Sequence, residues 1–581
     1  MNKIIKSLLQ ICFAFPLFFS FCKEAPAPQV VEKFSTDELS VQHGMSLFNQ
    51  NCASCHSFEE NGIGPNLTGI TRDVQKDWLK KFIHNPISVI QSGDERAKGL
   101  FTTYKQYMPP FASLQDAELE HLLGFIHKFS DGASKNKNNR PGGLIDPIKE
   151  KIQESDLVVE IKKIMTLPYT AEKSPLARIN KMAFIKTKSG SRNFILDLRG
   201  TLYEMVKDTV QIYFDLKSLV PKFIDNPGLA TGFGSFAFHP EFEKNGLLYT
   251  THTEPPKTAP ADFPIDDSIK VTVQWVLTEW KTKAPSSKVF EGTAREIMRV
   301  DMYSGIHGFQ DLSFNPYDKN GEPDFGMLYL GIGEGGSAVA GYPYLCDNNR
   351  KIWGSIIRID PSKHDSKNGQ YGIPSDNPFL QENDAVKEIW ARGFRNPHIF
   401  TWDRHLGMNT MFVTNIGQHS IEELNLVLPG KDYGWPNREG SFLYDVFANT
   451  EIVYPLPAQD SLPYEYPVLQ FDHDEGNAIC GGYVYHGKIK ALQGKYIFGD
   501  IPRGTLFFTE ANTLLQGQQA RIFKMKLKYA DKLTNLETVT GNTRVDLRFG
   551  MDAEGELYIF TKSNATIYKV IGCKKGNEKE I

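Results

Sequence analysis

The strongest constraint on this chain is a short motif near its N-terminus, Cys52-Ala53-Ser54-Cys55-His56. Two cysteines separated by two residues and followed at once by histidine form the attachment signature of a c-type haem. The thiols of Cys52 and Cys55 can add to the two haem vinyl groups, and His56 can then reach the iron as an axial ligand. The alternatives for this spacing are half of a zinc site and a redox-active cysteine pair.

Two further segments follow the motif in order, residues 64–69 (GPNLTG) and residues 108–111 (MPPF). Together with the cysteine motif they resemble class I cytochrome c. The resemblance implies that the carbonyl of Pro65 holds His56 and that the sulfur of Met108 is the second axial ligand of the iron. An iron with both axial positions filled has no open position for a substrate. We therefore expect one covalent haem c that transfers electrons.

Length and composition limit the number of domains, the partners and the disulfides that this chain can have. A chain of 581 residues predicts about three or four domains. A net charge of −4 and the lack of a basic tract argue against nucleic acid as a partner. Seven cysteines are too few for a disulfide scaffold. Cys346 and Cys480 either pair or remain free thiols, because the sequence does not show whether they are close.

Residues 1–22 are typical of a secretory leader. Two lysines precede an apolar run, residues 8–21, which is long enough for a signal sequence and short for a membrane span. The run ends at Cys22 and resembles a bacterial lipoprotein leader, although Phe21 stands where that pattern has a small residue. We expect an extracytoplasmic protein, in the periplasm or cell envelope, held to the membrane only by a lipid on Cys22. Cleavage near residues 25–27 is the alternative.

The next segments predict a tether, residues 23–36, and a small all-α domain, residues 37–131. Residues 78–83 indicate one helix, which ends before a proline. An apolar stripe at helical spacing predicts the last helix, with Leu119, Leu122, Leu123, Ile126 and Phe129 on one face. Residues 132–155 contain Gly, Lys, Asn and Pro and predict a linker.

From residue 156 to residue 573, apolar runs of period two alternate with turn residues. One pattern of strand, turn and returning strand recurs at residues 236–249, 312–330 and 549–559. Repeated antiparallel units favour a β-propeller, and a region of this length would hold roughly six long-looped blades. The predicted fold is multidomain, with a small all-α cytochrome c domain followed by an all-β six-bladed propeller. Residues 255–288 and 442–467 are expected to be insertions.

Five segments of this region resemble the soluble quinoprotein glucose/sorbosone dehydrogenases, which are six-bladed propellers that bind pyrroloquinoline quinone (PQQ) and calcium. They are residues 391–397 (ARGFRNP), 416–425 (IGQHSIEELN), 432–436 (DYGWP), 481–485 (GGYVY) and 494–500 (GKYIFGD). The resemblance implies oxidation of a CH–OH group of a small sugar or alcohol, with PQQ as the first electron acceptor and the haem as the second. The acceptor after the haem is not indicated.

The resemblance places the catalytic base at His307. A histidine titrates near neutrality, so it can take the hydroxyl proton while a hydride leaves the same carbon. Well-known members have an aspartate before this histidine, whereas this chain has Ile306. The carboxylate that orients the base is therefore missing or comes from elsewhere in the chain.

The resemblance also implies contacts to PQQ from Arg395, Asn396, Arg503 and Arg548, since guanidinium groups suit a ligand that carries carboxylates. A lysine of the family aligns near Pro502, so that contact is expected to be lost.

The resemblance also implies calcium on the backbone carbonyls of Gly417 and Gln418, and oxygen ligands of this kind are what a hard cation prefers. Glu422 and Glu423 fall in the acidic part of the same loop. The alternative function is a lipid-anchored electron-transfer cytochrome whose propeller is a non-catalytic binding platform, which the changes at Ile306 and Pro502 favour.

Overall fold

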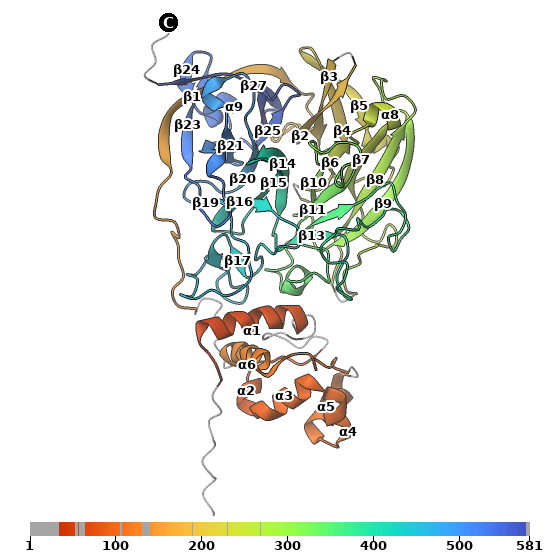
Figure 1. Ribbon diagram of the computed structural model, residues 1–581, viewed down its shortest axis with the longest axis vertical. Coiled ribbons are helices and arrows are strands. Elements are labelled where there is room, and N and C mark those ends of the chain that lie inside the picture. The colour runs from red at the N-terminus through yellow and green to blue at the C-terminus, as the bar shows by residue number, and fades with distance from the viewer. Residues whose placement is uncertain are drawn as a thin grey trace, which may run out of the picture.

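The computed structural model describes residues 34–576, apart from residues 53–55, 57, 59–63, 105–106, 131–139, 189, 229 and 268. A helical domain is followed by a large domain of strands (Figure 1). Within the described part of the chain, no helix is both long and apolar enough to cross a membrane. The predicted leader and Cys22 lie outside the described residues.

The helical domain includes the two predicted helices, at residues 76–84 and 116–130, among six helices in its described residues. They are α1 (Glu38–Asn51), α2 (Ile70–Asp73), α3 (Lys76–His84), α4 (Pro86–Gln91), α5 (Glu95–Tyr104) and α6 (Asp116–Ser130). The carboxylate of Asp37 caps α1 by accepting a hydrogen bond from the Ser40 N–H at 3.0 Å. The apolar stripe of α6 is buried and packs against α1.

Four separate sheets of four antiparallel strands make up most of the second domain. The first two are β2 (Ile179–Thr187), β3 (Gly190–Asp197), β4 (Thr201–Val206), β5 (Thr209–Asp215) and β6 (Phe233–Phe238), β7 (Leu247–Glu254), β8 (Val273–Thr282), β9 (Gly292–Met302). The next two are β10 (Phe309–Phe314), β11 (Leu328–Ile332), β12 (Ser355–Ile359), β13 (Ile389–Arg392) and β14 (Pro397–His405), β15 (Met408–Asn415), β16 (Ile421–Val427), β19 (Leu469–Asp472).

A fifth sheet has nine strands instead of four. Its members are β1 (Gln153–Thr166), β20 (Ile479–Val484), β21 (Lys495–Asp500), β22 (Leu506–Glu510), β23 (Phe523–Tyr529), β24 (Lys532–Thr534), β25 (Leu547–Met551), β26 (Leu557–Thr561) and β27 (Thr566–Lys575). The first strand, β1, pairs in antiparallel fashion with β27 and in parallel with β23. The prediction of six separate blades is therefore not met, because β1 joins two antiparallel runs into one sheet.

The recurring sequence pattern is confirmed as paired strands. Its three copies form β6–β7, β10–β11 and β25–β26, each an antiparallel pair that opens a run. The prediction that residues 255–288 form an insertion is wrong in part, because β8 occupies most of the second half of that stretch. Short elements fill other connections, namely α7 (Leu216–Leu219), α8 (Phe242–Asn245), α9 (Leu536–Thr540), β17 (Arg438–Glu439) and β18 (Phe442–Leu443).

The strand order brings distant residues to one end of the propeller, which we call the site end. Successive strands alternate in direction, so loops before a first strand and loops between second and third strands lie at the same end. His307 and Arg395 precede the first strands β10 and β14. Glu334, Gly417 and Lys562 follow the second strands β11, β15 and β26.

Candidate haem site and candidate active site

The haem motif lies directly after α1. The backbone N–H of Cys52 donates to the Phe48 carbonyl at 2.7 Å, and the N–H of His56 donates to the Cys52 carbonyl at 3.0 Å. Cys52 is buried in the apolar core of the helical domain, and the half-buried Met108 packs against the same core. Cys55 lies outside the described residues.

The orientation of His56 agrees with the role that the resemblance implies. Its Nδ1 lies 2.9 Å from the carbonyl oxygen of Pro65. Burial lowers the pKa of His56, and the hydrogen bond that His56 donates to the Pro65 carbonyl only partly opposes this shift. A neutral imidazole that donates from Nδ1 keeps Nε2 for a metal. With an apolar core around it, this donor set fits a haem iron.

His307 forms a buried pair with a carboxylate that the sequence analysis missed. Its Nδ1 lies 3.1 Å from Oε1 of Glu334, which follows β11. Burial and the nearby guanidinium of Arg395 lower the pKa of His307, while Glu334 opposes them. His307 also has a φ of 49°, a left-handed conformation that is uncommon for a residue other than glycine. The backbone therefore holds this imidazole in an unusual and defined position.

Glu334 is itself fixed by its own loop. Its carboxylate accepts hydrogen bonds from the N–H groups of Gly336 at 2.7 Å and Ala338 at 2.9 Å. Burial alone would raise the pKa of Glu334, but the hydrogen bond and charge of His307 lower it overall. The orienting carboxylate absent at Ile306 thus comes from another loop. The sequence signal was a lone acidic residue in a glycine-rich turn after a strand, Gly333-Glu334-Gly335-Gly336.

Buried cations gather at the site end. The Nε of Arg548 and the Nζ of Lys562 donate to the same Oδ1 of Asn180, at 3.0 Å and 3.1 Å. Arg548 Nη2 lies 3.4 Å from Nε2 of His398. Among the residues that the structure describes, no carboxylate lies within ion-pairing distance of Arg395, Arg548 or Lys562.

Burying this group of cations without an anionic ligand is unfavourable in free energy. Burial lowers the pKa of Lys562 well below its ordinary value, and the charge of Arg548 lowers it further. His398 is also buried, and its Nδ1 has no hydrogen-bond partner among the described residues. Sequence reasoning missed Lys562, because a single lysine after a strand carries no motif. The arrangement suits an anion with several oxygen atoms.

Arg395 and Asn396 enter the same end of the propeller, but Arg395 is engaged by the predicted calcium loop. Its Nη1 donates to the Gly417 carbonyl at 2.5 Å, and its Nε donates to Oε1 of Gln418 at 2.8 Å. The buried Oδ1 of Asn396 has no hydrogen-bond partner within the described chain. The arginine thus supplies positive charge at the position where calcium was expected.

The acidic part of the predicted calcium loop is also engaged in hydrogen bonds. Glu422 lies 3.0 Å from His473 Nε2, and Glu423 accepts from Asn415 at 2.7 Å. Burial raises the pKa of Glu423 to about 7.

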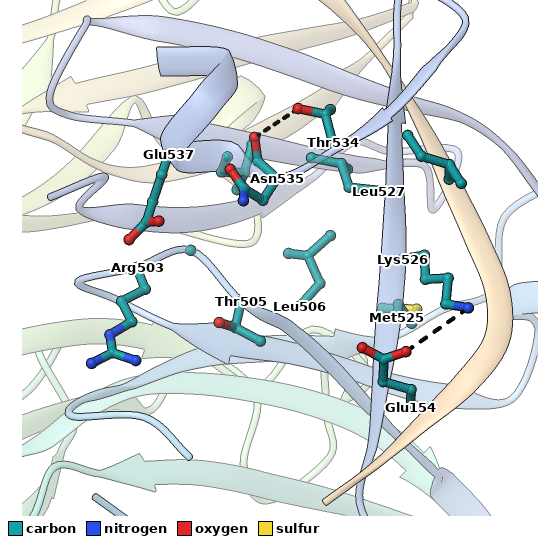
Figure 2. A pocket seen from close by; sticks show the side chains of 13 residues that line it. Glu154, Arg503, Thr505, Leu506, Met525, Lys526, Leu527, Thr534, Asn535 and Glu537 are labelled. Atoms are coloured by element: carbon teal, nitrogen blue, oxygen red, sulfur yellow. Dashed lines mark hydrogen bonds and ion pairs between the residues drawn. The ribbon is translucent and has the colours of Figure 1, made fainter. Parts of the chain in front are cut away.

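Arg503 lies apart from the cation group. It is exposed and lines a separate cavity of about 310 Å³ together with Glu154, Lys526 and Glu537 (Figure 2). Figure 2 shows its guanidinium on the side of the cavity near Glu537, with the Lys526–Glu154 ion pair opposite. Arg503 thus lines this separate cavity, although the β21–β22 loop that carries it is at the site end.

The buried histidine–carboxylate pair and the cation group thus lie on a propeller that is joined to a haem-type helical domain. The match to the glucose/sorbosone dehydrogenase family covers residues 220–569, and a match to cytochrome c covers residues 41–130. Because the first match spans more than half of the chain, the chain belongs to the glucose/sorbosone dehydrogenase family.

Individual relatives are distant. HIPL2 protein of Arabidopsis thaliana is 28% identical over 318 residues, which are 48% of this chain and 44% of that protein. The chain thus spans less than half the length of this plant relative. Human hedgehog-interacting protein is 28% identical over 591 aligned residues, covering 97% of this chain and 74% of that protein.

A bacterial relative is an aldose sugar dehydrogenase of Escherichia coli, 26% identical over 250 residues, or 42% of this chain and 57% of that protein. A solved apo-form structure of a soluble aldose sugar dehydrogenase from the same organism covers 72% of this chain and all of that chain, with a TM-score of 0.50 and 18% identity. At this identity the solved structure supports the fold alone.

Proposed function

We propose that this protein is a PQQ-dependent dehydrogenase of sugars or alcohols that passes electrons to its own haem. The observation that carries the proposal is the buried group of cations without carboxylate partners, which lies at the same end of the propeller as His307 and Glu334. Buried cations are stabilised by an anionic ligand, and PQQ carries carboxylates. Arg548, Lys562 and Asn396 would hold it.

A bound PQQ would supply the quinone that accepts a hydride from the substrate carbon. Neutral His307 removes the hydroxyl proton with Nε2, while Nδ1 keeps its proton and donates it to Glu334 in a hydrogen bond. The buried carboxylate of Glu334 holds the ring in place and stabilises the imidazolium that forms.

The proposal includes calcium on the carbonyls of Gly417 and Gln418, but it gives the ion no role in the reaction. Calcium requires about six to eight oxygen ligands. Here the guanidinium of Arg395 already takes the Gly417 carbonyl. Glu439 is the candidate additional ligand. One of its oxygens accepts from the Gln418 N–H at 2.7 Å, and the other is buried without a hydrogen-bond partner among described residues.

The test combines cofactor binding with haem reduction. Haem-loaded protein is titrated with PQQ, with and without calcium, and is then offered a panel of aldoses and simple alcohols while the haem absorbance is followed. We expect saturable PQQ binding and reduction of the haem by at least one substrate.

His307→Ala should abolish the reduction of the haem. The control variant His364→Ala, which removes an exposed histidine, should not. Equal reduction rates in both variants would contradict the proposal.

A second function is favoured by a specific observation. Arg395 already donates hydrogen bonds to Gly417 and Gln418, so the charge of this one cation is partly compensated without a bound ligand. In addition, human hedgehog-interacting protein aligns with almost the whole chain. The propeller would then be a binding platform on an electron-transfer cytochrome. Absence of PQQ binding by calorimetry would favour this function over the first.

Three structural details belong to the same proposal. If each antiparallel run of the nine-stranded sheet is counted as a blade, the propeller has six. We also propose the lipid anchor on Cys22 and an extracytoplasmic location, because thioether attachment of haem takes place outside the cytoplasm. Mass spectrometry of the mature N-terminus tests the anchor.

A further inference from the structure

One aromatic side chain of the propeller inserts into the core of the helical domain. The ring of Phe447 lies 5.7 Å from Phe125, 5.9 Å from Phe129, 6.0 Å from Phe48 and 6.3 Å from Phe58, between ring centroids. These distances are those of packed aromatic pairs. The core that contains Cys52 is therefore completed by a residue of the propeller.

Polar contacts surround this aromatic contact. Arg438 is fully buried, and its Nη2 donates to Oε1 of the buried Gln42 in α1 at 3.1 Å. His43 Nε2 lies 3.2 Å from Ser461 Oγ, also across the two domains. Figure 1 shows α1 against the segment that contains β17. Buried, hydrogen-bonded contacts of this kind define one relative orientation of the domains.

The propeller segment that contains β17 and Phe447 also reaches the site end. Trp435 stacks on Tyr444 with ring centroids 4.9 Å apart and an interplanar angle of 26°. The guanidinium of Arg395 lies 5.8 Å from the Trp435 ring. Trp435, Tyr444 and Phe447 also belong to one apolar cluster. Aromatic side chains of this segment therefore lie between Arg395 and the helical core, with Trp435 stacked on Tyr444 and Phe447 packed against the same apolar cluster.

We propose that residues 435–454 are the docking surface for the cytochrome domain, with Phe447 as its anchor, and that Trp435, Tyr444 and Phe447 form the electron route between the two sites. The redox part rests on the proposed function. Oxidation of one CH–OH group to a carbonyl releases two electrons and two protons. The hydroxyl proton leaves to solvent through His307, and the proton that travels as part of the hydride would be released when the reduced acceptor gives up its two electrons. Each electron reduces haem iron(III) to iron(II), and a one-electron acceptor outside the chain reoxidises the iron each time.

Docking is tested by small-angle X-ray scattering on the full, haem-loaded chain. A compact chain of this length has a radius of gyration of roughly 25 Å. Phe447→Ala and Phe447→Asp should raise the radius of gyration, because the cytochrome domain then moves on its linker. Phe508→Ala, at a buried propeller phenylalanine remote from the interface, should not. Unchanged scattering in both Phe447 variants, with wild-type circular dichroism, would overturn the docking surface.

The electron route is tested with two assays on the same preparations. A soluble dye that accepts electrons measures turnover of the propeller alone, and haem absorbance measures transfer to the iron. Phe447→Ala and Tyr444→Leu should slow substrate-driven haem reduction by roughly tenfold or more. Dye-linked turnover and reduction of the haem by dithionite should stay as in the wild type. Haem reduction at the wild-type rate would overturn the route. A wild-type protein without dye-linked turnover would refute the proposed function and the route, and the scattering result would still decide the docking surface.

Discussion

The side chains of His307 and Glu334 are 27 residues apart in sequence and 3.1 Å apart in space. The carboxylate that was expected directly before the histidine is supplied instead by the loop after β11. The pair remains a base and its orienting group, because the hydrogen bond from Nδ1 leaves Nε2 as the basic nitrogen. The substitution at Ile306 therefore does not by itself argue against catalysis.

Replacing Glu334 should change both the rate and its pH dependence. The base works in its neutral form, so activity is lost as the pH falls through the pKa of His307. Glu334 raises that pKa against the effect of burial. Glu334→Gln should therefore move the acid limb of the kcat/KM profile to lower pH, and it should lower kcat by roughly 10 to 100-fold. An acid limb at the wild-type position would contradict the role of Glu334.

Lys562→Met should stabilise the protein without PQQ and weaken its binding of PQQ. In the folded protein the pKa of Lys562 is depressed by burial, so the unfolded chain binds more protons. Stability of the wild type should therefore rise with pH between the folded and unfolded pKa values of this lysine. The variant should lose this dependence and gain about 1–3 kcal/mol in the free energy of unfolding. The control is Lys222→Met, at an exposed lysine, and equal stabilisation of both variants would refute the prediction.

Gly64→Ala should disturb the haem ligand. A Cβ at Gly64 would lie 2.5 Å from Cε1 of His56, so the imidazole would have to move away from the Pro65 carbonyl. We expect a changed haem spectrum and a lower haem content. Gly99→Ala is the matched control, because it lies in α5 with no atom within 4 Å of the added Cβ. It should be neutral or stabilising by up to about 1 kcal/mol.

Cys346 and Cys480 should remain reduced. Both are buried free thiols, and they lie in different apolar clusters. Burial raises the pKa of Cys480 to about 11, and it raises that of Cys346 as well. Neither should react with iodoacetamide at pH 8 until the protein is unfolded. A disulfide between them in mass spectra of unreduced protein would contradict the structure.

Much of the architecture was readable from local patterns. The apolar stripe from Leu119 to Phe129 is the buried face of α6. The three copies of the recurring sequence pattern are strand pairs. These features depend on periodicity within about fifteen residues, which the sequence contains. The sheet of nine strands was not predictable in the same way. Its closure depends on β1 meeting β23, more than 350 residues later.

The sequence by itself determined the haem motif, the two domain types and the position of His307. Each of these depends on residues that are close together in the chain, so their spacing can be read directly. Only the tertiary structure decided which groups complete the sites. Glu334 reaches His307 from another loop, Asn180 joins Arg548 and Lys562 from the opposite end of the propeller sequence, and Phe447 enters the helical core. Such partners are selected by the closure of the propeller and by burial, and neither is encoded in any short stretch of sequence.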